Sequence, residues 1–125
     1  MIAADTSTWS AFLQGEPGHD TELLDDGLKD QQLVMVPVVL TEVLSDPGLP
    51  PQVAEMLAEL PLLDIDSGFW RRAARLRAAV LKMGRKARLG DALIAQCCID
   101  HGIPLITRDR DFRIFAESAG LKLPA

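Results

Sequence analysis

Short apolar runs alternate with amphipathic segments along the chain. The runs occupy residues 1–4, 33–36 and 103–106, and two further candidate strands at 62–65 and 121–123 each contain one charged residue. Their length and the turn residues around them are typical of strands buried on both faces of a parallel sheet. Because segments with helical periodicity separate them, the pattern predicts an α/β domain with a mainly parallel central sheet and right-handed crossovers.

The segments between the runs carry apolar residues at helical spacing. We expect Thr6 or Ser7 to cap the first helix, which follows Asp5, and Ser67 to cap the longest one. The other predicted helices cover residues 19–30, 38–44, 53–60, 68–83, 91–101 and 112–118. The apolar faces of helices 19–30 and 53–60 fit either the core or a groove for a partner helix.

The length of the chain limits its organisation. A chain of 125 residues can form one domain with its own hydrophobic core. No apolar run approaches the roughly 20 residues that span a membrane. The two cysteines, Cys97 and Cys98, are adjacent, so they lack the spacing of a zinc site or a redox motif. We therefore expect a single cytoplasmic domain over residues 1–125 with no membrane association.

Charge is distributed very unevenly. The net charge is −5, yet residues 1–66 carry thirteen acids and one base, whereas residues 67–125 carry twelve bases and five acids. We call eight of these bases the basic stretch: Arg71, Arg72, Arg75, Arg77, Lys82, Arg85, Lys86 and Arg88. It is either the solvated face of a helix or a surface for phosphates, and the sequence favours neither. The four of these bases nearest to Asp91 in sequence are the candidates for binding RNA phosphates: Lys82, Arg85, Lys86 and Arg88.

Five acids stand where apolar residues or strand ends are expected. Asp5 is the only charge in the first fifteen residues, and Glu42 is the only one between positions 33 and 45. Asp91 lies on the helix face that also carries apolar residues three, four and seven positions later, so its burial needs a cation or hydrogen bonds. Asp109 and Asp111 follow a predicted strand. Carboxylates gathered at one end of a parallel sheet would repel each other unless Mg²⁺ or Mn²⁺ joined them.

Each acid taken alone also has a purely structural explanation. Asp5 and Asp91 could each cap a helix and gain from its dipole. Glu42 could be a solvated helix charge. Asp109 and Asp111 could form ion pairs with the arginines of their own loop.

Four motifs occur in a fixed order along the chain. They are IAADTS at residues 2–7, LTEV at 40–43, GDALIA at 90–95 and LITRDRDF at 105–112. Together they resemble the four acidic motifs of the PIN-domain family, and within it those of VapC-type toxins from bacterial toxin–antitoxin modules. The resemblance covers essentially the whole chain.

The resemblance implies a three-layer α/β/α sandwich and a Mg²⁺- or Mn²⁺-dependent ribonuclease in which a metal-activated water cleaves RNA. It makes Asp5, Glu42, Asp91 and Asp109 the metal-site and catalytic acids, with Asp111 as an auxiliary acid. Either Asp109 or Asp111 could be the closer ligand.

The resemblance also assigns supporting residues and partners. Thr6, Ser7 and Thr107 match hydroxyl residues that orient carboxylates or water. The implied partners are an RNA substrate, a cognate antitoxin and a second copy of the chain. The alternative is a non-catalytic PIN-like or receiver-like module that binds a metal ion without cutting RNA. A receiver would have a second acid beside Asp5, and this chain has none there.

Overall fold

The structure, a computed structural model, describes residues 1–124. At its centre, strand β1 (Ala3–Ala4) pairs in parallel with strand β2 (Leu105–Ile106). All four residues are buried because helices cover both faces of the pair. Because the two strands are parallel, the segments that follow them lie at the same edge of the pair.

The predicted strands at 33–36 and 62–65 form only isolated bridges. Ile2 bridges Leu33, and Met35 bridges Leu62, both in parallel. The predicted strand at 121–123 is wrong: this segment makes a backbone hydrogen bond from Leu105 N to Lys122 O at 2.9 Å but is not a strand. All bridges are parallel, as the alternating pattern predicted.

Each helix begins and ends within two residues of its predicted position. Proline at the first turn and glycine after the last turn determine several of these ends. The helices are α1 (Thr6–Leu13), α2 (His19–Lys29), α3 (Pro37–Leu44), α4 (Pro51–Glu59), α5 (Phe69–Lys82), α6 (Leu89–His101) and α7 (Arg113–Ala119), with a 3₁₀ turn η1 (Arg110–Phe112) before α7.

Two predicted caps are wrong, whereas the alternative that Asp5 caps the first helix is confirmed. Asp5, not Thr6 or Ser7, caps α1, because its backbone is extended and its Oδ1 accepts a hydrogen bond from Thr8 N at 3.0 Å. At α5 the cap position is Gly68, and no side chain caps it. Asp5 therefore has a structural role in addition to any chemical one.

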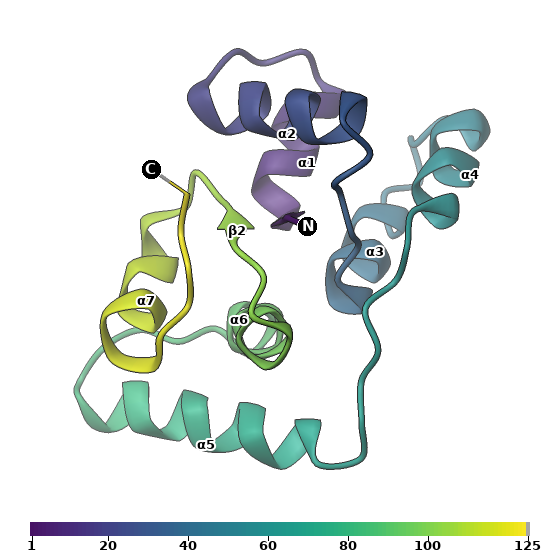
Figure 1. The fold of residues 1–125 in the computed structure, drawn as a ribbon. Helices are drawn as coiled ribbons and strands as arrows, with labels where there is room; N and C mark the ends of the chain where they lie inside the picture. Colours follow the sequence, from purple (N-terminus) through teal and green to yellow (C-terminus); the bar gives the residue numbers. More distant parts are fainter. Residues whose placement is uncertain (125) are drawn as a thin grey trace.

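The helices form two layers around the strands. Figure 1 shows α1 and α2 on one side and α5, α6 and α7 on the other, while α3 contacts both α1 and α6. This is the predicted three-layer sandwich. Leu24 and Leu57 are fully buried, so these residues of α2 and α4 belong to the core and not to a groove. Among residues 1–124, no helix is long and apolar enough to cross a membrane.

Candidate metal centre

Asp91 lies in the first turn of α6 with one carboxylate oxygen buried. This atom, Oδ2, has no hydrogen-bond partner among the described residues. The cap position of α6 is Arg88, so the capping explanation for Asp91 is wrong. Burial, and then the negative charge of Asp109, raise the pKa of Asp91 to about 6, although Arg88 opposes the rise. An unpaired buried carboxylate oxygen costs free energy unless a cation or a donor satisfies it.

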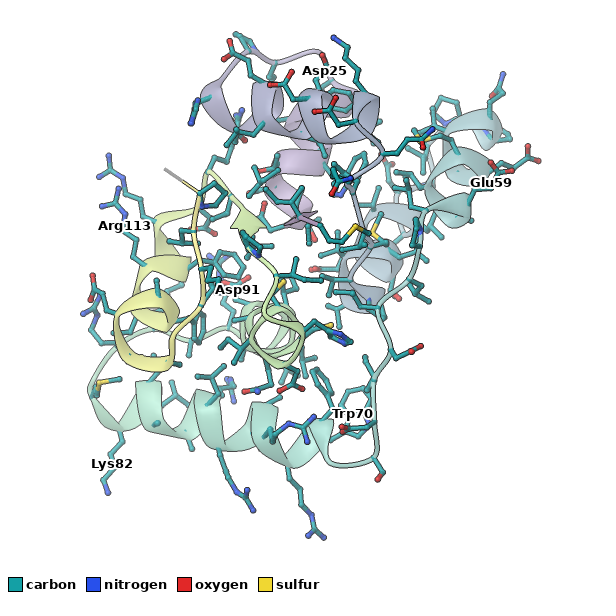
Figure 2. All side chains as sticks on the ribbon, in the orientation of Figure 1. Asp25, Glu59, Trp70, Lys82, Asp91 and Arg113 are labelled. Carbon is teal, nitrogen blue, oxygen red and sulfur yellow. The ribbon has the colours of Figure 1, made fainter. Side chains whose placement is uncertain are left out.

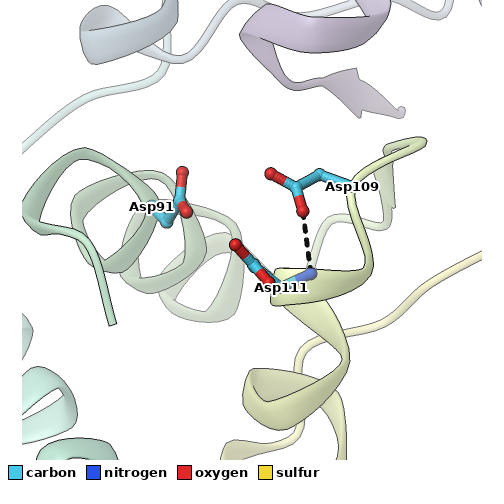
Figure 3. A group of neighbouring side chains, drawn as sticks. All are labelled: Asp91, Asp109 and Asp111. Atoms are coloured by element: carbon cyan, nitrogen blue, oxygen red, sulfur yellow. Dashed lines mark hydrogen bonds between the residues drawn. The ribbon is translucent and has the colours of Figure 1, made fainter. Parts of the chain in front are cut away.

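Asp109 and Asp111 approach Asp91 from the opposite side. Asp109 caps η1, because its Oδ1 accepts a hydrogen bond from Asp111 N at 2.8 Å. Figure 3 shows the three carboxylates facing one another between α6 and η1. One oxygen from each lies within 4.8 Å of the others. We call Asp91, Asp109 and Asp111 the carboxylate cluster.

Asp5 lies directly after β1 and is 2% exposed. In addition to the bond from Thr8 N, its Oδ2 accepts hydrogen bonds from Ser7 Oγ at 2.8 Å and Thr107 Oγ1 at 2.7 Å. These donors compensate for its burial. Asp5 is not a member of the carboxylate cluster, but its charge contributes to the raised pKa of Asp91.

Thr107 connects Asp5 to Asp109. The hydroxyl that donates to Asp5 also accepts a hydrogen bond from Asp109 N at 2.9 Å. Because Thr107 follows β2 and Asp5 follows β1, the parallel pairing of the two strands brings these residues together. The Thr107 hydroxyl therefore fixes the backbone of Asp109 relative to the buried Asp5.

Glu42 is exposed on α3 and lies beside the start of α6. Its Oε1 accepts a hydrogen bond from Thr6 Oγ1 at 2.7 Å. Its Oε2 lies 3.6 Å from the position that a Cβ on Gly90 would occupy. Glu42 is thus near Asp91 along α6 but outside the carboxylate cluster, whereas Asp111, predicted as an auxiliary acid, is inside it.

The arginines of the Asp109 loop do not neutralise its acids. Arg108 instead binds Asp20 at 2.7 Å and Glu16 at 3.1 Å. Within residues 1–124, the ion pair of Asp111 is with Lys86, at 3.2 Å. The predicted pairing with arginines of the same loop is therefore wrong, and the cation beside the carboxylate cluster comes from the basic stretch.

The basic stretch divides into anchored and exposed members. Arg72 binds Asp100 and Asp66, at 2.7 and 2.8 Å, and joins α5 to α6. Arg77 Nε donates to Ala87 O at 2.8 Å and holds the segment after α5. Figure 2 shows Lys82 projecting outward from α5. The exposed members, for which the described residues offer no ion pair, are Arg71, Arg75, Lys82, Arg85 and Arg88.

Known proteins share this fold and part of this sequence. The family model for the PIN domain matches residues 2–118. Ribonuclease VapC11 from Mycobacterium tuberculosis strain H37Rv is 27% identical to this chain over 129 residues, which cover 98% of this chain and 96% of the relative. The structure of VapBC-5, a toxin–antitoxin system of the same species, is similar with a TM-score of 0.69 and 24% identity, over 98% of this chain and 95% of that chain. VapBC2 from Rickettsia felis, solved with a DNA fragment from its promoter, is similar with a TM-score of 0.75 and 20% identity, over 99% and 98%.

Proposed function

Because this chain belongs to the PIN-domain family, we propose that it is a metal-dependent endoribonuclease and the toxin of a toxin–antitoxin pair. The observation that supports this most strongly is the carboxylate cluster, with the unpaired buried oxygen of Asp91 beside Asp109 and Asp111. The curated relative VapC11 is named as a ribonuclease and is similar over almost its whole length.

The residues present fit a hard divalent cation. Asp91, Asp109 and Asp111 offer carboxylate oxygens within 4.8 Å of one another, and oxygen ligands suit Mg²⁺ or Mn²⁺. Such an ion, when bound, lowers the pKa of water and polarises a phosphodiester oxygen. Asp91 and Asp109 would hold it from α6 and from the loop after β2, with Asp5 and Glu42 adding negative charge behind and beside them.

The surrounding side chains would keep these ligands in position. Thr107 fixes Asp109 through its backbone N–H, and Ser7 and Thr107 fix the oxygens of Asp5. Thr6 holds Glu42 toward the start of α6. Lys86 partly neutralises Asp111 and restrains it. Hydrogen bonds of this kind set the orientation of metal ligands.

The substrate would approach across the end of the basic stretch. Lys82, Arg85, Lys86 and Arg88 precede Asp91 in sequence, and Arg88 is close enough to Asp91 to lower its pKa. An acidic pocket repels RNA, so cations beside it are needed to attract the phosphate backbone. Few aromatic residues are available for stacking, which favours recognition by charge and shape.

Two further partners are part of the proposal. Two similar solved structures, VapBC-5 and a complex from Klebsiella pneumoniae, are toxin–antitoxin assemblies, which supports a cognate antitoxin for this chain. We also propose that the toxin forms a homodimer. Coexpression with the cognate antitoxin should yield a stable complex in which RNA cleavage is inhibited. Light scattering on the chain alone should give the mass of a dimer.

The test of the activity is cleavage of RNA by the purified chain with Mg²⁺ or Mn²⁺. Asp91→Asn and Asp109→Asn should each reduce the rate by more than about 100-fold, because even residues behind metal ligands contribute about 10–100-fold. Asp64→Asn changes an exposed carboxylate outside the site and serves as the matched control. Cleavage that persists in EDTA, or that is equal in the wild type and both site variants, would contradict the proposal.

A further inference from the structure

A hollow of about 390 Å³ adjoins the carboxylate cluster. It lies between the start of α2, the end of β2 and the residues that lead into α7. Its volume falls in the range of roughly 300–1,000 Å³ that is typical of sites for small organic molecules. Asp109 lines the hollow and also belongs to the carboxylate cluster, so the hollow and the cluster meet at this residue.

Cations dominate one side of the hollow. Arg108, Arg110 and Arg113 all line it. Arg108 is neutralised by Asp20 and Glu16. Arg110 and Arg113 are exposed and form no ion pair with any residue of the described chain. Figure 2 shows Arg113 projecting outward from the start of α7. The hollow therefore offers two guanidinium groups for an anion.

Apolar side chains also line the hollow and are partly exposed. Leu23, Leu123 and Pro124 line the hollow, and each is only partly buried. Apolar surface beside guanidinium groups suits an unstacked nucleobase together with its phosphate, because bases rest on apolar or guanidinium planes and phosphates accept hydrogen bonds from arginine.

Contacts behind the hollow hold its wall in place. Asp20 Oδ2 accepts hydrogen bonds from both Arg108 Nε at 2.7 Å and Thr8 Oγ1 at 3.0 Å. A Cβ on Gly18 would lie 2.6 Å from Asp20 Oδ1, so glycine at this position leaves room for the ion pair. The wall is thus preformed, which reduces the entropy lost when a ligand binds.

We propose that this hollow binds one unpaired nucleotide of the RNA substrate, next to the phosphodiester at the carboxylate cluster. Arg110 and Arg113 hold its phosphate, and its base rests against Leu23 and Leu123. The inference rests on the proposed ribonuclease function, because it requires an RNA strand that leaves the cluster beside Asp109. The subsite would select the nucleotide beside the cut, and it shares Asp109 with the carboxylate cluster, which would act on the phosphodiester.

Binding can be measured without any cleavage. The four nucleoside 5′-monophosphates are titrated in turn, in EDTA, into the isotope-labelled full chain while backbone amide shifts are recorded. At least one nucleotide should shift the amides of residues 105–113 and 23, and Arg110→Ser with Arg113→Ser should weaken that binding by at least about tenfold. Arg71→Ser with Arg75→Ser removes the same charge from α5 and should leave the binding unchanged.

Two further probes separate a nucleotide subsite from a merely cationic surface. Inorganic phosphate should bind more weakly than the preferred nucleotide, because it lacks the base. Hexaglutamate should not compete with the nucleotide. Equal binding of phosphate and all four nucleotides, competition by hexaglutamate, or no shift in these residues with any nucleotide would overturn the inference.

Cleavage distinguishes failure of the subsite from failure of the proposed function. If the chain is a ribonuclease and the subsite is correct, the Arg110/Arg113 variant cleaves with a raised KM and an altered preference for the nucleotide beside the cut. Full wild-type cleavage and preference in this variant would overturn the subsite and leave the ribonuclease intact. Absence of cleavage by the wild type would instead contradict the proposed function.

Discussion

The Asp91 side chain illustrates how one residue can be unfavourable for folding and useful for binding. Its buried Oδ2 lacks a partner among residues 1–124, and burial together with nearby acids raises its pKa to about 6. A cation placed between Asp91 and Asp109 would give the unpaired oxygen a partner and would offset the repulsion between the two carboxylates. The carboxylate therefore destabilises the metal-free fold at neutral pH.

This destabilisation predicts a pH-dependent effect of Asp91→Asn in EDTA. Below the ordinary pKa of 3.8, Asp91 is neutral in both the folded and the unfolded chain. As the pH rises to about 6, the unfolded chain loses the proton first, so stability falls, and above that pH the penalty is constant. The penalty is at most about 3 kcal/mol, and solvent screening reduces it to about 1–2 kcal/mol.

Urea unfolding near pH 7.5 and near pH 4 measures this difference. Asp91→Asn should raise the free energy of unfolding at the higher pH by about 1–2 kcal/mol and leave it nearly unchanged at the lower pH. Asp64→Asn is the control for removing an exposed carboxylate. A gain of equal size at both pH values would show that Asp91 is not the residue that titrates.

Thr107 should be a positioning residue rather than a metal ligand. Thr107→Val removes the donor to Asp5 and the acceptor for Asp109 N, and should cost about 1–3 kcal/mol of stability because a buried carboxylate loses a hydrogen bond. Cleavage should fall by about 10–100-fold, mainly in kcat. Thr107→Ser keeps the hydroxyl and should restore most of the rate. As the control, Thr41→Val removes an exposed hydroxyl on α3 and should leave the rate unchanged. Equal cleavage rates for Thr107→Val and Thr107→Ser would contradict the positioning role of Thr107.

At the scale of elements, α2 depends on a glycine inside the helix. Gly27 is buried, and a Cβ there would overlap Cδ2 of Leu33, which bridges Ile2 just before β1. Alanine is the better helix former by about 1 kcal/mol, but overpacking costs about 1–3 kcal/mol. Gly27→Ala should therefore lower the urea midpoint, and Leu33→Val in the same chain should recover part of it. Glu22→Ala, on the exposed face of α2, is the control. If Gly27→Ala raised the urea midpoint, the close packing of Gly27 against Leu33 would be contradicted.

Helices were predictable because their ends depend on local chemistry. Pro37 and Gly102 mark such ends within a few residues of sequence. The ends of the strands were harder to predict. β1 and β2 pair over two residues each, and the segment at 121–123 only accepts a backbone hydrogen bond from Leu105. Periodicity records burial, but it does not record how many residues of an apolar run find a partner strand.

The acids were predictable as a group, but their contacts were not. Asp5 and Asp109 could be placed at one end of the sheet because each follows a predicted parallel strand, whereas Asp91 stood out by its position on an apolar helix face. The ion pair of Arg108 with Asp20 joins residues far apart in the chain, and nothing local distinguishes Arg108 from Arg110. The choice between Asp109 and Asp111 likewise depended on the turn of η1, which places both beside Asp91.

Over the whole molecule, a chain with a net negative charge must attract RNA, which is also negatively charged. The exposed end of the basic stretch is the surface that can do so, and Arg85→Gln with Arg88→Gln tests it. The double variant should lower kcat/KM and reduce the slope of log kcat/KM against log salt by about 0.7 for each phosphate that the protein no longer neutralises. Arg71→Gln with Arg75→Gln makes the same change of charge on α5 and should have little effect. Identical slopes in both variants would assign the attraction to another surface.

A cation held by the carboxylate cluster should enable RNA cleavage. Mn²⁺ titration of one sample tests this dependence, with bound Mn²⁺ measured by electron paramagnetic resonance and cleavage measured in parallel. The rate should rise in proportion to occupancy of a site that Asp91→Asn abolishes, and both should be lost together in that variant. A variant that cleaves RNA at the wild-type rate without bound Mn²⁺, or a wild type that binds Mn²⁺ but cleaves no RNA, would contradict the claim.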